Sequence, residues 1–315
     1  MTKQILVTGG TGYLGGRICQ HLAQTGKYQL RLTTRKLHDA PNPYSFEFIT
    51  TDFSDDQLSP SLCNDVDTII HLAALNAADC AADPARAIQV NVTGTQKLVS
   101  VAQSADVKRF IYISTAHIYG APLIGTISEQ SIPNPQHPYA WTHRAAEDIV
   151  LSEKSFEGIV LRLSNGTGAP HNLDVNCWML LGNDLCRQAV ETGKMVLRSP
   201  GLDQRDFIPL SDVSVAVDHM INLNLEKLDG RIFNLGSGNS LSVYEFATLV
   251  ADRAKLILGK RPEIRRPETT QSHKPSHLNY KATALSQTGF ASSASLSEAI
   301  DETLQFCVSN LRSGQ

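Results

Sequence analysis

The first 163 residues alternate short, continuously apolar runs with longer segments in which apolar residues recur every three or four positions. Such runs are typical of strands buried on both faces, and the longer spacing is typical of helices with one buried face. The pattern therefore predicts a parallel sheet covered by helices on both sides. Strands are predicted at 5–7, 29–34, 46–50, 68–72, 109–114 and 158–163, and helices from Tyr13 onward, at 83–104 and at 139–153.

The pattern becomes mixed after residue 163. Residues 166–176 are loop-like, and predicted strands at 206–210 and 231–235 return to the sheet with a helix at 211–225 between them. Helices are also predicted at 176–191, 243–258 and 296–310, with a short strand at 263–266. We predict a doubly wound α/β domain of the Rossmann type (1–165 plus 206–235). A smaller, discontinuous α+β substrate-binding lobe (166–205 plus 236–315) begins after a boundary near Ser164.

A glycine-rich turn joins the first predicted strand to the first predicted helix. Glycines at positions 9, 12 and 15 allow a tight turn, close approach of the backbone to a pyrophosphate and close packing of helix on strand. The helix N-terminus offers that phosphate unpaired N–H groups and a partial positive charge. The segment predicts dinucleotide binding by Gly9, Gly12, Tyr13, Leu14 and Gly15.

The residues after the second and third predicted strands bear on the choice of cofactor. The second strand ends in Thr34, Arg35 and Lys36, without the carboxylate that would accept hydrogen bonds from a free ribose 2′-hydroxyl. Two cations suit a 2′-phosphate, so NADP is predicted in preference to NAD, the alternative being a solvated basic loop. Asp52 and Phe53 stand where side chains flank an adenine, although Asp52 also fits a simple turn.

Composition narrows the classes of function. The formal net charge of −3 lacks the basic excess of a nucleic-acid surface, and no apolar run approaches the ~18–20 residues that span a bilayer. The six cysteines are scattered without a C-x-x-C pair, and the chain enters its first strand without room for a signal peptide. We therefore expect a soluble cytoplasmic protein with no nucleic-acid or membrane partner.

The histidines show no spacing typical of metal ligands, so no metal is expected. His71 lies within a predicted strand and is expected to be packed. His117 and His171 are placed where they can reach the cleft.

Taken together, these features and several further motifs resemble the extended short-chain dehydrogenase/reductases. This is the NAD(P)-dependent epimerase/dehydratase group that UDP-galactose 4-epimerase exemplifies. The likeness covers essentially the whole chain. The motifs are residues 70–74 (IHLAA), 91–95 (NVTGT), 111–120 (IYISTAHIYG), 138–143 (PYAWTH), 162–165 (RLSN), 204–213 (QRDFIPLSDV) and 233–238 (FNLGSG).

The resemblance implies roles for individual residues. Thr115 and Tyr139 take the positions of the catalytic hydroxyl residue and the catalytic acid/base. It implies a nucleotide-sugar substrate and, because family members often pair through two helices, a homodimer through 83–104 and 139–153. The implied cofactor contacts are Leu72, Ala73, Ala74 and Asn91, and the implied substrate contacts are Thr115, Asn165, Asn176, Arg205 and Arg266.

One position departs from the family motif, which has lysine where this chain has His143. The family lysine holds the nicotinamide ribose and lowers the pKa of the tyrosine, and a neutral histidine would do only the first. A protonated His143 would do both. The substitution favours reduction, in which Tyr139 acts as an acid, over epimerisation, which needs a base. Two alternatives stay open: a catalytically weakened dinucleotide-binding regulatory protein, and a reductase of a non-nucleotide carbonyl.

Overall fold

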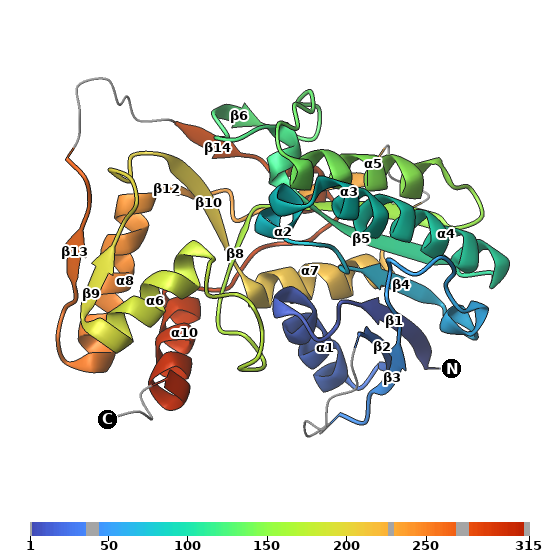
Figure 1. Cartoon of the computed structure of the whole chain (residues 1–315), viewed down its shortest axis with the longest axis horizontal. Helices are drawn as coiled ribbons and strands as arrows, with labels where there is room; N and C mark the ends of the chain where they lie inside the picture. The colour runs from blue at the N-terminus through green and yellow to red at the C-terminus, as the bar shows by residue number, and fades with distance from the viewer. Residues whose placement is uncertain (1, 36–43, 226–229, 269–276, 312–315) are drawn as a thin grey trace.

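A computed structural model of the chain describes residues 2–35, 44–225, 230–268 and 277–311. Its centre is a seven-stranded parallel sheet with the order β11-β7-β5-β4-β1-β2-β3 (Figure 1). The six strands predicted before residue 164 are all present, which confirms the predicted parallel sheet. Its strands are β1 (Lys3–Thr8), β2 (Tyr28–Thr34), β3 (Glu47–Thr50), β4 (Thr68–His71), β5 (Arg109–Thr115), β7 (Glu157–Leu163) and β11 (Ile232–Leu235).

Helices cover both faces of this sheet, as a doubly wound fold requires (Figure 1). One face packs on α1 (Tyr13–Thr25) and α7 (Leu210–Asn222), and the other on α4 (Gly94–Ser104) and α5 (Pro138–Ser152). The helix predicted over 83–104 is divided into α3 (Pro84–Ala87), a π-helical stretch (Ile88–Thr93) and α4. Further short helices within the described residues include α2 (Ala77–Ala82), α9 (Thr283–Gln287), and 3-10 turns at Pro60–Cys63 and Ala116–Tyr119.

A second apolar cluster lies beside the parallel sheet and is built mainly from α6, α8 and α10 (Figure 1). These helices span Leu181–Thr192, Val243–Leu258 and Leu296–Leu311. Small sheets accompany them: β8 (Asn165–Thr167) with β10 (Gln204–Pro209) and β12 (Ser240–Ser242), β9 (Lys194–Val196) with β13 (Glu263–Arg265), and β6 (Gly125–Ile127) with β14 (Leu278–Tyr280). The predicted residue boundaries of two domains stay a prediction.

The structure corrects three predictions for the second half. The strand predicted at 206–210 does not return to the large sheet, because β10 pairs with β8 and β12. Its apolar residues are divided between two cores: Phe207 packs in the second cluster, where its ring stacks 4.0 Å from that of Phe246, and Ile208 packs in the core of the large sheet. An apolar run indicates burial without saying which sheet supplies it. The segment predicted as loop opens with β8, and the helix predicted from 176 begins at Leu181.

None of the helices in the described residues is both long and apolar enough to cross a membrane.

Candidate active site

The glycine-rich turn has the shape that a close backbone approach requires. Gly9 adopts φ +69°, and a Cβ there would lie 3.0 Å from the backbone nitrogen of Ala73. A Cβ on Gly15 would lie 2.1 Å from the carbonyl oxygen of Gly9, so helix α1 can pack on the turn only with glycine at this position. The Gly12 N–H donates to the Gly9 carbonyl at 3.0 Å. Gly12 is also the N-cap of α1, with no side-chain cap, which leaves the helix N-terminus open to a phosphate.

The two residues after Gly12 serve packing as well as the turn. The Tyr13 hydroxyl donates to the Gly168 carbonyl at 2.8 Å and to Asn183 Oδ1 at 3.0 Å, so this side chain ties α1 to α6. Leu14 packs against the core of the large sheet. Only the backbone of Tyr13 is therefore left for the predicted cofactor contact.

The end of β2 presents one of the two predicted cations. Thr34 is buried in the strand, and Arg35 is exposed directly after it. Lys36 lies outside the described residues. Asp52 accepts hydrogen bonds from the N–H and hydroxyl of Ser54 at 2.8 and 2.7 Å, and these bonds, followed by the charges of Arg35 and Arg86, lower the pKa of its carboxyl. Arg86 thus adds a second cation to this corner, which the sequence reasoning missed.

Beneath the loop after β4 lies a buried hydrogen-bond network formed by Thr8, His71 and Thr95. The Thr8 hydroxyl lies 2.6 Å from His71 Nδ1 and accepts from the N–H groups of Leu72 and Ala73, while His71 Nε2 lies 2.9 Å from the Thr95 hydroxyl. Burial lowers the pKa of His71 to about 3, so the ring is neutral. This network fixes the backbone of Leu72 and Ala73. Ala74, the third predicted contact, is exposed in the same loop. As expected, His71 is packed, and its neighbours include the ring of Phe53 at 5.4 Å.

Asn91 hydrogen-bonds both the same loop and α5, the helix that carries Tyr139 and His143. Its Oδ1 accepts from the Leu75 N–H at 2.8 Å, and its Nδ2 donates to the Thr142 hydroxyl at 3.1 Å. Asn91 is buried. Its side chain therefore links α5 to the β4 loop, and its predicted cofactor contact stays a prediction.

Thr115, Tyr139 and His143 come together at the end of β5. The Thr115 side chain hydrogen-bonds the Tyr139 phenol, and the Tyr139 and His143 rings meet edge to face with centroids 4.5 Å apart. Tyr139 lies in the first turn of α5, where its N–H donates to Nδ1 of His137 at 3.1 Å. His143 follows one turn later on the same helical face. Burial raises the pKa of Tyr139 to about 12, against the opposing effect of the Thr115 hydrogen bond.

His143 is neutral in this setting. It is buried, and burial, with a smaller effect of His117, lowers its pKa to about 3. Its Nδ1 lies 2.6 Å from the hydroxyl of Tyr112 on β5. Its other ring nitrogen, Nε2, is buried and has no hydrogen-bond partner among the described residues. The same is true of the hydroxyl of Ser114, on the same face of β5 as Tyr112.

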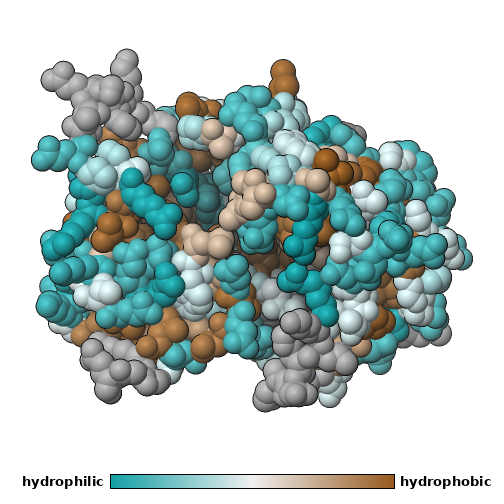
Figure 2. Space-filling model, in the orientation of Figure 1, coloured by the Kyte–Doolittle hydropathy of each residue, from teal (hydrophilic) through white to brown (hydrophobic). Residues whose placement is uncertain are grey.

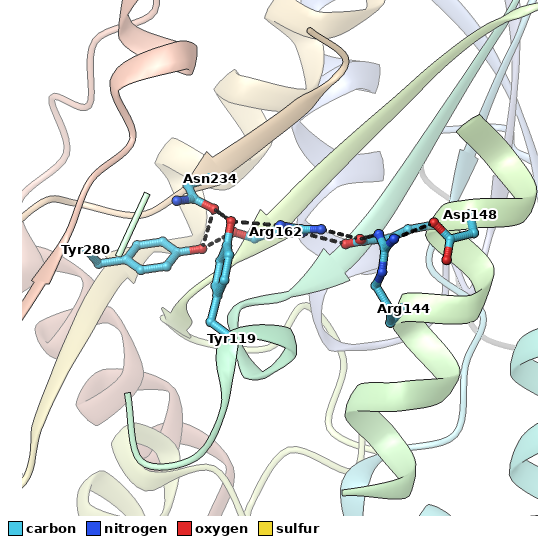
Figure 3. Close-up of polar contacts among 7 residues, drawn as sticks. Tyr119, Arg144, Asp148, Arg162, Asn234 and Tyr280 are labelled. Atoms are coloured by element: carbon cyan, nitrogen blue, oxygen red, sulfur yellow. Dashed lines mark hydrogen bonds and ion pairs between the residues drawn. The ribbon is translucent and has the colours of Figure 1, made fainter. Parts of the chain in front are cut away.

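A buried ion pair holds helix α5 against the sheet (Figure 3). Arg162 on β7 binds Glu147 on α5 through two hydrogen bonds of 2.9 and 2.6 Å, and both side chains are almost completely buried. Arg162 also donates to the Tyr119 hydroxyl, which donates to Asn234 at 2.7 Å. Tyr280 on β14 completes the network by donating to the Arg162 carbonyl at 2.7 Å. Strands β7, β11 and β14 thereby fix the helix one turn beyond His143.

The predicted substrate residues lie on the strands of the second cluster. Asn165 on β8 donates to the Asp206 carbonyl at 2.9 Å, and Arg205 is exposed on the neighbouring strand β10. Burial and, after it, the charge of Arg205 lower the pKa of His117, whose ring lies 6.4 Å from the Tyr139 ring. Strand β10 therefore reaches the candidate catalytic residues. On the face shown in Figure 2 the surface is recessed between the large sheet and this cluster.

Two further predicted substrate residues are separate from this group. Arg266 lies 3.6 Å above the centre of the Tyr244 ring and donates to the Pro200 carbonyl at 2.9 Å, which fixes its guanidinium near the start of α8. Asn176 is exposed in the loop before α6. His171, which was expected to reach the cleft, packs against Gly16 of α1.

Sequence reasoning assigned no role to Tyr112, the partner of His143. The strand period could have pointed to Tyr112. It precedes Ser114 by two residues in a strand, so the two side chains share a face. Which helix residue meets that face depends on how α5 packs.

The site fits a dinucleotide on two observations. Gly9 and Gly15 let the turn, the β4 loop and helix α1 pack closely where a Cβ would collide, and His143 Nε2 and Ser114 Oγ are buried polar atoms without partners among the described residues. Unpaired buried polar atoms cost free energy, and a hydroxyl-rich ligand would satisfy them.

Comparisons with known proteins agree with this geometry. A sequence model of the NAD dependent epimerase/dehydratase family matches residues 5–236. The human dTDP-D-glucose 4,6-dehydratase is 29% identical over 262 residues, which cover 78% of this chain and 72% of that protein. The GDP-6-deoxy-D-mannose reductase of Pseudomonas aeruginosa is 28% identical over 267 residues and 82% of each chain.

A solved structure shares the fold. The UDP-glucuronic acid 4-epimerase of Bacillus cereus in complex with NAD superposes with a TM-score of 0.80 at 22% identity, covering 96% of this chain and 98% of that one.

Proposed function

The chain belongs to the NAD-dependent epimerase/dehydratase family, and from this premise we propose that it reduces the keto group of a nucleotide-activated sugar with NADPH. The relatives named above act on nucleotide sugars according to their names, and one of them is a reductase. The direction of the reaction is argued from the residues around Tyr139.

The observation that carries the proposal is the neutral His143 beside a protonated Tyr139. A phenol whose pKa is raised to about 12 keeps its proton at neutral pH, and no cationic side chain at position 143 helps to remove it. Reduction of a ketone needs a proton donor at the carbonyl oxygen, whereas oxidation of an alcohol needs a base there. The site therefore suits reduction.

The residues divide the chemistry between them. A bound nicotinamide dinucleotide would supply the hydride to the carbonyl carbon. Tyr139 donates its proton to the carbonyl oxygen as the alcohol forms, and Thr115, which hydrogen-bonds Tyr139, orients that oxygen. The Thr115 hydroxyl oxygen accepts from the His117 N–H at 3.2 Å, which fixes its side chain.

Arg205 and Asn165 support a nucleotide diphosphate as the activating group of the substrate. A thermal-shift panel of UDP-, GDP-, CDP- and dTDP-sugars should find a stabilising ligand, and Arg205→Ala should weaken its binding by about 1.5–3 kcal/mol, the value of a charge-assisted hydrogen bond. Arg265→Ala removes an exposed arginine on β13 that pairs with Glu263 and should leave binding unchanged. If no nucleotide sugar stabilises the protein at millimolar concentration, the proposed substrate class is wrong.

Arg35 supports NADP as the cofactor. Calorimetry should give tighter binding of NADPH than of NADH, and Arg35→Ala should remove most of that difference because the guanidinium would bind the 2′-phosphate. Arg261→Ala, the loss of an exposed arginine paired with Asp252 in the second cluster, is the matched control. Equal affinities of the wild type for the two cofactors would contradict the proposal.

A regulatory dinucleotide-binding protein is the second candidate, because the same neutral His143 weakens any step that needs phenolate. The two are separated by following NADPH consumption with a panel of keto-sugar nucleotides. Turnover supports the reductase. Tight dinucleotide binding without turnover by the wild type or by His143→Lys supports the regulatory protein, and turnover of simple ketones alone supports a reductase of non-nucleotide carbonyls.

A further inference from the structure

The reduction described above makes no use of His117, an exposed histidine beside the candidate catalytic residues. His117 lies in the 3-10 turn Ala116–Tyr119 directly after β5, where its N–H donates to the Thr115 hydroxyl oxygen at 3.2 Å. Its ring meets that of Tyr139 edge to face, with centroids 6.4 Å apart. Within the described residues neither ring nitrogen of His117 takes part in a hydrogen bond, so both are open to a bound molecule.

The His117 ring lies in a recess that is open to solvent. The side chain is exposed, yet burial lowers its pKa, with smaller effects of Arg205 and His137. Arg205 on β10 shows the same combination, because it is exposed while burial lowers the pKa of its guanidinium. A side chain that protein atoms surround and solvent still reaches lines a concave surface. His117 and Arg205 therefore line one recess at the Tyr139 ring.

His117 is an unprotonated base at neutral pH, since its pKa is lowered from the usual histidine range. The other groups beside Tyr139 do not offer this. The Cys80 thiol is buried, and burial raises its pKa, so it keeps its proton. His137 accepts the Tyr139 N–H with Nδ1, which leaves the hydrogen of its neutral ring on Nε2. Among the described groups that shift the pKa of Tyr139 or His117, none is a carboxylate.

A keto sugar bound at Thr115 and Tyr139 would bring an acidic C–H group to this base. A carbonyl acidifies the hydrogens on the carbon next to it, because the negative charge left by proton removal spreads onto the carbonyl oxygen. That carbon lies only about 2.4 Å from the oxygen, as standard bond lengths require. An oxygen held by Thr115 and Tyr139 thus places the neighbouring carbon in the recess that His117 borders.

We propose that His117 is a general base that removes a proton from the sugar carbon next to the keto group, which gives the site a second activity, enolisation of the keto sugar. The C–H electron pair forms a carbon–carbon double bond, the carbonyl π pair moves to oxygen, and Tyr139 donates its proton to that oxygen. The reverse step returns a proton to the carbon, and Tyr139 recovers its own. The proton returned by His117 restores the configuration at that carbon, whereas one from water on the opposite face inverts it. The step needs no oxidant or reductant, and it rests on the proposed function only in that the substrate is a nucleotide-activated keto sugar.

The first test follows hydrogen exchange in D₂O without NADPH, with the full-length protein and UDP-, GDP- and dTDP-activated 4-keto sugars as probes. By mass spectrometry and proton NMR, the wild type should place deuterium on the carbon next to the carbonyl faster than an enzyme-free sample. His117→Gln should slow this exchange by about 10²–10⁴-fold, the usual contribution of a positioned general base. His171→Gln, the same change at a histidine that packs against Gly16, should leave the exchange unchanged.

The second test asks whether the imidazole itself is what the exchange requires. Imidazole added to His117→Ala should restore exchange in proportion to its concentration, because a small base then enters the space of the missing ring. Restoration also shows that the variant is folded. Exchange by His117→Gln at the wild-type rate would overturn the proposal. Loss of exchange that imidazole does not restore would make His117 a structural residue and would overturn it as well.

The outcomes separate this inference from the proposed function, because the two reactions label different carbons. NADPH deuterated at the transferred position labels the carbonyl carbon during reduction, and D₂O labels its neighbour during enolisation. Reduction without solvent deuterium at the neighbouring carbon overturns the inference and leaves the proposed function intact. Solvent exchange without reduction supports the inference and contradicts the proposed reductase. Absence of both labels from all of these sugars contradicts both.

Discussion

Tyr139→Phe is expected to lower the rate of ketone reduction by about 10²–10⁴-fold, the usual contribution of a positioned general acid. The change removes the one phenol that Thr115 holds at the candidate reaction centre. The ring stays in contact with His143, so dinucleotide affinity should be unchanged. Steady-state kinetics with NADPH and the keto sugar selected by the ligand panel, together with calorimetry of the cofactor, measure both quantities.

The pH dependence of the wild type follows from two shifted pKa values. His143, with a pKa of about 3, is already neutral at pH 5, and Tyr139, with a pKa of about 12, is still protonated at pH 9. The rate of reduction should therefore be level between these values and should fall only at strongly alkaline pH, as Tyr139 loses its proton. A rate that changes through the usual histidine range near pH 6.5 would mean that His143 titrates and acts as a cation.

His143→Lys is the companion variant that restores the family residue. A cation ~5 Å from the phenol, at an effective dielectric of about 20, favours phenolate by roughly 3 kcal/mol, or about two pKa units. Alcohol oxidation or epimerisation should then increase at neutral pH far more than reduction. An equal change in both directions would contradict the assigned role of position 143, and unimpaired turnover by Tyr139→Phe would contradict that of Tyr139.

Glu147→Gln is expected to destabilise the fold by about 3–5 kcal/mol, the range found when one partner of a buried ion pair is removed. The substitution leaves the Arg162 guanidinium buried without its carboxylate, and arginine cannot relieve this by losing a proton. Arg144, which also contacts Glu147, is itself a cation and offers Arg162 no substitute for the carboxylate. Urea denaturation gives the difference in free energy of unfolding.

Asp148→Asn is the matched control on the next residue of the same helix. Asp148 pairs with the same Arg144 but is exposed, so its loss should cost no more than about 1 kcal/mol. The contrast isolates burial, because both variants convert an α5 carboxylate to its amide. Similar small effects of the two substitutions would show that the network in Figure 3 does not stabilise helix α5.

Much of the fold and part of the site follow from local sequence. The continuous apolar runs predict the parallel strands because both faces of such a sheet are covered, and Gly9 and Gly15 predict the dinucleotide turn because no other residue fits those backbone positions. Thr115 and Tyr139 were found through motifs that stand at strand and helix ends. The short strand β8 was missed, since three residues carry too little periodicity to be recognised.

The sequence by itself determined the glycine turn, the parallel sheet, the Thr115 and Tyr139 positions and the presence of histidine where the family has lysine. Only the tertiary structure decided the charge state and the hydrogen-bond partner of that histidine. Its neutral state comes from burial, and its Nδ1 lies 2.6 Å from the hydroxyl of Tyr112, 31 residues away in the chain. The placement of β10 outside the large sheet was decided in the same way, by pairing with β8 and β12. Hydrophobic spacing records whether a residue is buried, whereas charge state and strand pairing depend on which distant residues are buried with it.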